Sequence, residues 1–211
     1  MTTNYDQIVA TLNHFAEQAK SRPLSLGEAL DSLDHAAYAL IAMILALPYL
    51  QPVPMGPLTV LGGITYAVLG WQLLRGHESP ALPQRMRAVE MSERSWRILT
   101  KVCLKVVKLV NKFTRPRLTW LTAGSRGQKI GGLILLSAGL LMAVPFGVLP
   151  FNNTLPGLAV LFYAFGQFEQ DGLMVLISFL WLILTALYFG YFFYLAWYFG
   201  AEAVHHMPNL W

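Results

Sequence analysis

Hydrophobic residues form three long runs that contain no charged side chain. Asp, Glu, Lys and Arg are missing from residues 35–74, 130–168 and 172–201, which are 40, 39 and 30 residues long. A helix crosses a bilayer with about 20 mostly apolar residues. The pattern therefore excludes an ordinary soluble domain and predicts an all-α integral membrane protein.

Prolines interrupt the first two runs near their middles, at Pro48, Pro52, Pro54 and Pro57 and at Pro145, Pro150 and Pro156. Proline removes a helical hydrogen bond and clashes with the preceding turn, so each run is predicted to be a helical hairpin. The predicted arms, 36–50 with 58–74 and 130–149 with 155–168, measure about 22, 26, 30 and 21 Å. Most of them are shorter than the hydrocarbon core of about 30 Å. The hairpins are thus short enough to be re-entrant, with freed backbone groups that must be buried in protein or face water.

The two hairpins resemble each other at a spacing of about 97 residues. Ala46-Leu47-Pro48 aligns with Ala143-Val144-Pro145, and Tyr66-Ala67 aligns with Tyr163-Ala164. An internal repeat of broken hairpins is typical of transporters. We therefore expect a repeated unit, parallel if both hairpins enter and leave on the same side.

A basic stretch joins the two hairpins. Six basic residues, spaced three or four apart, fall within an arc of about 80° on a helix: Arg94, Arg97, Lys101, Lys105, Lys108 and Lys112. Apolar residues, Trp96 and Val106 among them, occupy much of the remaining surface. This pattern predicts a helix in the membrane interface that turns its basic stripe toward anionic headgroups. A helix packed on the other segments with its charges in water fits equally well.

The remaining segments complete one membrane domain. Residues 1–24 are polar and weakly amphipathic, and Ser25-Leu26-Gly27-Glu28 predicts a capping box. The domain is expected to comprise 25–76 (first hairpin), 77–128 (basic linker), 129–172 (second hairpin) and 173–200, with a short tail at 201–211. Residues 173–199 hold 11 aromatic side chains. They predict a transmembrane helix that is either one tilted span or broken near Gly190.

Composition and charge agree with a membrane location. Charged residues make up 12% of the chain, about half the share in soluble domains. Thirteen of the 15 Lys and Arg residues lie between Arg75 and Lys129. Such a basic block between apolar runs predicts a cytoplasmic linker of a multi-pass membrane protein. The flanking apolar runs explain the block better than nucleic-acid binding does.

Residues with catalytic or metal-binding potential are few. Cys103 is the single cysteine, so a disulfide framework or thiolate metal cluster is excluded. His205-His206 has no third ligand near it in sequence, and His35 and His77 lie at the ends of apolar runs. We therefore expect no enzyme activity, no metal and no cofactor.

The remaining candidate site residues lie at the edges and breaks of the hairpins, namely Gly56, Gln72, Arg75, Asn152, Asn153, Glu169 and Asp171. Polar groups at such depth are costly and often functional. The alternative for Arg75, Glu169 and Asp171 is ordinary charged termination at the water interface. Asn153 is expected to cap a half-helix that begins near Pro156, and such an N-terminus inside the membrane favours an anion.

Several motifs resemble those of the exopolysaccharide-synthesis ExoD family of bacterial membrane proteins. They are Pro-Ala-Leu-Pro-Gln-Arg at 80–85, Arg-Pro-Arg-Leu-Thr-Trp-Leu-Thr at 115–122, Val-Pro-Phe-Gly at 144–147, Asn-Thr-Leu-Pro at 153–156 and Glu-Gln-Asp-Gly at 169–172. The resemblance covers roughly residues 25–200. It implies a multi-pass protein of the bacterial inner membrane with a part in exopolysaccharide production, and it leaves the molecular activity open.

These observations lead to two functional hypotheses. The first is a small transporter or flippase-like protein for an anionic lipid or a lipid-linked sugar intermediate. Arg75 would pair with a phosphate, and Glu169 or Asp171 would take coupling protons. The half-helices that begin near Gly56 and Asn153 would donate backbone N–H hydrogen bonds to the anion. The second is a non-catalytic assembly or regulatory subunit of a polysaccharide synthesis or export complex, docked through the aromatic helix. Membrane lipids are the expected partners in both, together with that complex or a second copy of the chain.

Overall fold

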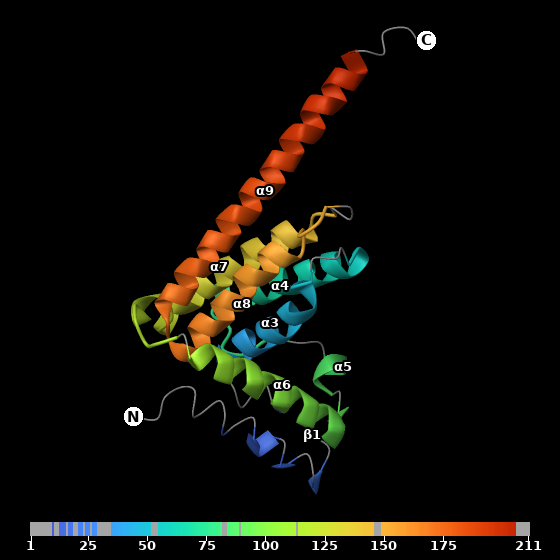
Figure 1. The fold of residues 1–211 in the computed structure, drawn as a ribbon. Coiled ribbons are helices and arrows are strands. Elements are labelled where there is room, and N and C mark those ends of the chain that lie inside the picture. Colours follow the sequence, from blue (N-terminus) through green and yellow to red (C-terminus); the bar gives the residue numbers. More distant parts are fainter. Residues whose placement is uncertain are drawn as a thin grey trace.

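The computed structural model describes residues 10, 13–15, 17–18, 21–22, 24–25, 27–28, 35–51, 55–81, 84–88, 90–112, 114–145 and 149–205. In these residues it contains seven α-helices, a short 3-10 helix and one pair of two-residue strands (Figure 1). Most of the predicted 1–24 segment, Pro54 in the first break and His206 in the tail lie outside the described residues.

The four arms of the two predicted hairpins are α3 (His35–Tyr49), α4 (Pro57–Leu74), α7 (Gly124–Ala143) and α8 (Thr154–Glu169). Pro57 occupies the first turn of α4, where its missing N–H has no helical partner to lose. Gly56 precedes it with φ 57°, a left-handed conformation that favours glycine. The breaks between arms therefore lie where the prolines predict them.

The first predicted arm, 36–50, agrees with α3, but Pro48 lies inside the last turn of this helix and is not the break residue that it was predicted to be. Both ends of the third predicted arm, 130–149, are wrong. α7 begins at Gly124, inside the expected linker, and ends at Ala143. Pro145 accounts for this early end, because proline disfavours the helical conformation of the residue before it, and Val144 has ψ 123°.

The two hairpins interlock. The second helix of each hairpin packs on the first helix of the other, so that α4 lies along α7 and α3 lies along α8. The α4–α7 pair meets backbone to backbone at Gly63 and Gly70 on α4 and at Gly132 and Gly139 on α7. Small residues allow this close approach, as in many membrane helix pairs. If the first hairpin is matched to the second, α4 corresponds to α8 and α7 to α3, so the α4–α7 pair corresponds to the α8–α3 pair. This pairing is the one expected of an internal repeat.

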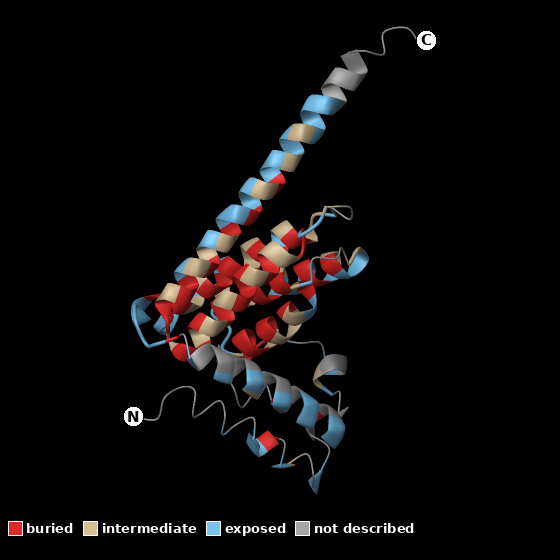
Figure 2. Cartoon of the chain, in the orientation of Figure 1, coloured by how far each residue is buried: buried red, intermediate tan, exposed pale blue. Residues whose placement is uncertain are grey.

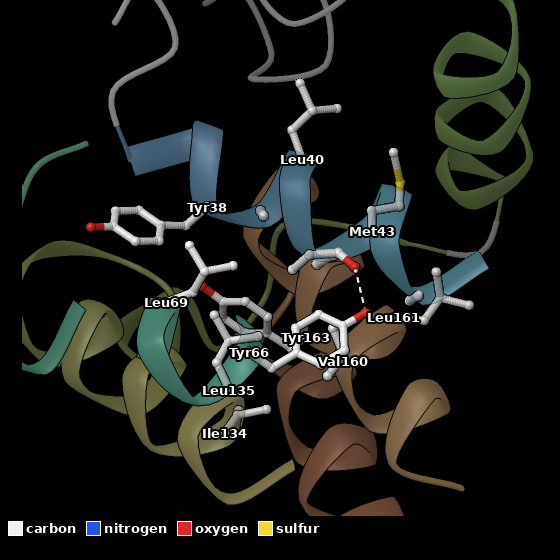
Figure 3. Packing of buried hydrophobic residues seen from close by; sticks show 14 of the residues in the cluster. Tyr38, Leu40, Met43, Tyr66, Leu69, Ile134, Leu135, Val160, Leu161 and Tyr163 are labelled. Carbon is white, nitrogen blue, oxygen red and sulfur yellow. Dashed lines mark hydrogen bonds between the residues drawn. The ribbon is translucent and has the colours of Figure 1, made fainter. Parts of the chain in front are cut away.

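The core lies between these four helices (Figure 2). Figure 3 shows its centre, where Tyr38 and Met43 of α3 lie near Tyr66 of α4 and Val160 and Tyr163 of α8. The Tyr66 hydroxyl, fully buried, donates a hydrogen bond to the Ala42 carbonyl at 3.3 Å. Each buried hydroxyl needs such a partner, because an unsatisfied polar group inside a core is costly.

The basic linker forms α5 (Gln84–Arg87), α6 (Glu93–Asn111) and the 3-10 helix η1 (Thr119–Leu121). α6 is the predicted amphipathic helix, and it contacts α8 beneath the four-helix core in the view of Figure 1. Trp96 of α6 is buried against the Phe15 ring of the N-terminal segment, at 5.7 Å between centroids. Strand β1 (Leu24–Ser25) pairs antiparallel with β2 (Glu90–Met91), a contact that the apolar pattern does not predict.

α9 (Gly172–His205) is the longest helix and continues through Gly190 without a break. It starts beside η1, packs on α8 and then extends well beyond the other helices (Figure 1). Within the described residues, α4 and α9 are long and apolar enough to cross a membrane.

The predicted capping box forms at the N-terminal side of the core. The Glu28 N–H donates to Ser25 Oγ, and the Ser25 N–H donates to Glu28 Oε2, both at 3.2 Å. Arg22 Nη1 also donates to Glu28 Oε1 at 3.0 Å, and this bond holds the pKa of Glu28 below its ordinary value of 4.5.

This depressed pKa predicts an acid transition confined to the capping box. A carboxylate whose pKa is lowered by folding stabilises the fold above its unfolded pKa, and the contribution is lost as the pH falls through the folded pKa. We expect the Ser25 and Glu28 amide resonances to shift together as the pH drops below about 4.5. In a Glu28→Gln variant the same resonances should stay unchanged over that interval. A transition that persists in this variant would assign it to another group.

Candidate functional site

A pocket of about 510 Å³ lies between the two proline breaks. Its lining comes from both hairpins and is mostly apolar: Gly56, Pro57, Thr59, Val60, Leu61, Val144, Pro145 and Asn152. We call it the break pocket. Its volume is within the range of pockets that bind small molecules. The two breaks, far apart in sequence, thus build one site together.

Thr59 contributes to the wall of the break pocket a hydroxyl group without a hydrogen-bond partner in the described part of the chain. The residue is 2% exposed, and its Oγ1 has no hydrogen-bond partner among the described residues. A buried hydroxyl without a partner costs about 1–3 kcal/mol. An oxygen of a bound molecule is the acceptor that would recover this free energy.

The two breaks are held together beside the pocket. Thr154 Oγ1 donates to the Gln51 carbonyl at 2.8 Å, and Asn153 Nδ2 points to the same oxygen at 3.4 Å. Asn153 occupies the N-cap position of α8 but makes no side-chain capping bond. The prediction that its side chain caps α8 is therefore wrong, because the amide is turned across the break to Gln51. The fully buried Asn153 also places this helix start against protein.

The other candidate residues lie at the opposite end of the four-helix core. Arg75 follows α4, whereas Gly56 precedes it, so the two are about 28 Å apart along the helix axis. Glu169 ends α8, whereas Asn153 precedes it. The structure therefore divides the predicted residues between two places. We call them the break end (Gly56, Asn153) and the basic end (Gln72, Arg75, Glu169, Asp171).

Gln72 fixes the chain that follows α4. Its side-chain amide pairs with the backbone of Ala81, donating at 3.0 Å and accepting at 2.8 Å. Tyr38 strengthens this contact by donating to the Ser79 carbonyl at 3.0 Å. Arg75 is exposed and its guanidinium lies 4.8 Å from the centroid of the Trp71 ring, a cation–π geometry. Arg75 remains accessible to an anion, whereas Gln72 has a structural role.

Asp171 is the centre of a hydrogen-bonded cluster. It is fully buried, and Arg117 Nε contacts its two carboxylate oxygens at 2.9 and 3.1 Å. The Arg115 N–H donates to Oδ2 at 3.1 Å, and the Leu173 N–H donates to Oδ1 at 2.9 Å, which caps α9. The hydrogen bond to Asp171 raises the pKa of Arg117 above its ordinary value, so the guanidinium stays charged. Asp171 thus ties the loop before η1 to the start of α9.

The basic face of α6 is exposed as predicted. It comprises Arg94, Arg97, Lys101, Lys105, Lys108 and Lys112, and all six are exposed; Lys112 lies just past the last helical residue. Figure 2 shows α6 as exposed turns that alternate with residues that are not described. The face is positioned to meet an anionic surface. Most of the apolar side chains opposite, and that of Cys103, are not described.

Comparison with known proteins places the chain in a family. The family model for exopolysaccharide synthesis, ExoD, matches residues 8–191. The chain belongs to the ExoD family. It is 30% identical to protein ExoD of Rhizobium meliloti over 196 residues, 92% of this chain and 81% of that protein. An uncharacterized protein of Synechocystis sp. is 22% identical over 162 residues, covering 77% and 75% of the two chains. No solved structure matches.

The ExoD motifs acquire a physical explanation from the Asp171 cluster. Residues 115–122 and 169–172, far apart in sequence, meet there: the Gly172 N–H donates to the Arg117 carbonyl at 2.7 Å. Thr122 Oγ1 lies 3.1 Å from Gln170 Oε1. Gln170 itself adopts a left-handed conformation, φ 52°, that ends α8. Two of the motifs are therefore one structural unit at the basic end.

Sequence reasoning finds part of the break pocket in this member of the ExoD family. Gly56, Pro57, Pro145 and Asn152 were singled out as break residues, and all four line it. Thr59 was missed, because a threonine within the first turns of an apolar helix gives no distinctive sequence signal. Among the described residues, no group of three or more His, Cys, Asp and Glu side chains could hold a metal ion.

Proposed function

We propose that this ExoD-family chain is a small transporter or flippase-like protein of the bacterial inner membrane. Its cargo would be an anionic lipid or a lipid-linked sugar intermediate of exopolysaccharide synthesis. The observation that carries the proposal is the break pocket, an apolar cavity built by both hairpins with the buried Thr59 hydroxyl in its wall. The link to exopolysaccharide comes from the family, whose description is exopolysaccharide synthesis.

In this proposal the basic end attracts the cargo. The exposed face of α6 concentrates anionic headgroups, and Arg75, exposed beside Trp71, contacts the phosphate. Asp171 has a structural role, because its carboxylate oxygens already accept bonds from Arg117, Arg115 and Leu173. Coupling to protons would then fall to Glu169, a buried carboxyl group at the end of α8.

A reconstitution assay tests the proposal. The purified protein in vesicles is expected to move labelled phosphatidylglycerol and a polyprenyl phosphate between leaflets, and Arg75→Ala is expected to slow both. Glu78→Ala, which removes an exposed charge from the same loop, is the matched control. A folded protein that moves neither lipid would contradict the proposal.

A second candidate function rests on the exposed surface of α9. Its C-terminal half carries exposed aromatic residues such as Tyr194 and Trp197. This surface would suit an assembly or regulatory subunit that docks on a polysaccharide synthase. Stoichiometric co-purification with a synthase, together with activity that survives Arg75→Ala, would favour this function over transport.

The basic face of α6 gives a separate prediction on lipid selectivity. We expect the variant with Lys101, Lys105 and Lys108 all changed to Gln to lose its preference for phosphatidylglycerol over phosphatidylcholine. Each basic residue near an anionic surface contributes about 1 kcal/mol, so removing three of them is expected to weaken the preference by up to about 3 kcal/mol, or about a hundred-fold. Mass spectrometry of lipids retained by the protein in mixed bilayers measures it. Raising the salt concentration should erase the difference; an unchanged preference at low salt would show that α6 does not face the headgroups.

A further inference from the structure

The level of the break end along α9 is fixed by one contact. The Tyr188 hydroxyl donates to the Pro150 carbonyl, in the turn between α7 and α8, at 2.6 Å. Tyr188 lies 16 residues after Gly172, about 24 Å along the helix axis. α8, with 16 residues, has the same length. The break end is therefore level with Tyr188, about halfway along α9.

Beyond Tyr188, α9 remains apolar around its circumference. Residues 189–199, the distal α9, extend about 16 Å further. The exposed fractions of their aromatic side chains include 60% for Tyr191, 79% for Trp197 and 61% for Phe199. Figure 2 shows this part of α9 as largely exposed and clear of the other helices. Because no charged residue occurs between Gly172 and Ala201, the medium that suits this helix is hydrocarbon with an aromatic belt at its edge.

The break end itself has the surface of a lipid-facing segment. Leu58, Leu61 and Phe151 are 55%, 59% and 46% exposed. The sequence of both breaks carries no charge, because each lies inside one of the uncharged runs. The basic end differs sharply, with Arg75, Arg126 and Lys129 exposed. Turns between helices normally carry charged residues when they lie in water. The uncharged break end and distal α9 therefore share one apolar environment.

We propose that the break end lies below the headgroups, within the hydrocarbon of the leaflet opposite the basic end, and that the break pocket holds the hydrocarbon chain of a lipid from that leaflet. The hairpins are then re-entrant, and α9 reaches the opposite surface. The apolar lining suits the hydrocarbon chain of the lipid, and an oxygen of the lipid accepts a hydrogen bond from Thr59. The assignment of a lipid to the pocket deepens the proposed function and rests on it, whereas the depth of the break end does not.

Depth-dependent quenching tests the first half of the proposal. In a Cys103→Ser background, a fluorophore is placed on Phe151→Cys at the break end, on Trp197→Cys in distal α9 or on Lys108→Cys in α6. We expect acyl-chain nitroxides to quench the Phe151→Cys label most and headgroup nitroxides to quench the other two. Quenching of the Phe151→Cys label by water-soluble iodide as strong as that of the Lys108→Cys label would overturn the proposal.

Native mass spectrometry tests the second half. Val60→Trp fills the pocket, whereas Val68→Trp changes an exposed residue two turns further along α4, outside the pocket. We expect a tightly held lipid in the wild type and in Val68→Trp and its loss in Val60→Trp. Equal retention in both variants would show that the pocket is not the lipid site. If lipid is retained as expected and vesicles show no lipid movement, the proposed transport fails while the pocket assignment stands.

Discussion

Gly139→Leu is expected to cause the largest loss of stability in the four-helix core. A Cβ atom at Gly139 would lie 2.5 Å from the Gly63 carbonyl oxygen and would also clash with the Ala67 backbone nitrogen. Both neighbours are backbone atoms of α4, so no side chain can move aside. Overpacking usually costs about 1–3 kcal/mol, and here we expect at least the upper value. Thermal unfolding in detergent, followed by circular dichroism, measures the loss.

Gly190→Leu is the matched control for this substitution. It places the same side chain on another apolar helix, α9, where nothing lies within 4 Å of the added Cβ. The melting temperature of this variant is expected to equal or exceed that of the wild type, because glycine is a poor helix former. Similar melting of Gly139→Leu and Gly190→Leu would show that α4 and α7 do not meet through their glycines.

Asp171→Ala is expected to have the second largest effect. The substitution removes the acceptor for Arg115, Arg117 and Leu173 at a fully buried position and removes the cap of α9. Loss of a helix cap costs about 0.5–2 kcal/mol, and the space left at the fully buried Asp171 position adds to it, so a loss of about 2 kcal/mol is expected. Faster amide exchange at residues 115–122 and at the start of α9 would locate it.

Asp171→Asn separates the geometric and charge contributions. Its amide oxygen can still accept one of the backbone N–H bonds but carries no charge to match Arg117, so an intermediate loss is expected. Glu169→Gln tests the proton-coupling hypothesis independently, because it leaves the Asp171 cluster intact. Wild-type stability of Asp171→Ala would mean that residues 115–122 and 169–172 are not held together by this carboxylate.

The positions of the breaks could be predicted from the sequence, whereas the pairing of the helices could not. Proline chemistry acts locally, so α4 begins at Pro57 as expected. The α4–α7 pairing depends on Gly63 and Gly70 meeting Gly132 and Gly139. Each pair is seven residues apart, a signal present in the sequence but silent about which helix is the partner. The first turns of α7 were assigned to the linker because Arg126 and Lys129 end the apolar run.

The sequence predicted one site for the candidate residues, whereas the structure separates them into two groups. The pattern of apolar runs shows which polar residues interrupt them but does not show how far apart those residues lie in the folded chain. Arg75 and Asn153 were therefore assigned to one hypothetical site. In the structure they belong to opposite ends of the core. Asp171 could not be recognised as structural either, because Arg117 lies 54 residues away in sequence.

The rate of lipid movement in vesicles containing Val60→Trp, compared with Val68→Trp, tests the central claim most directly. The two variants carry the same substitution on the same helix, α4, and of the two positions only Val60 lines the break pocket. The account predicts wild-type movement of phosphatidylglycerol or polyprenyl phosphate with Val68→Trp and little movement with Val60→Trp. Equal rates for the two variants, or no movement with the wild type, would contradict it.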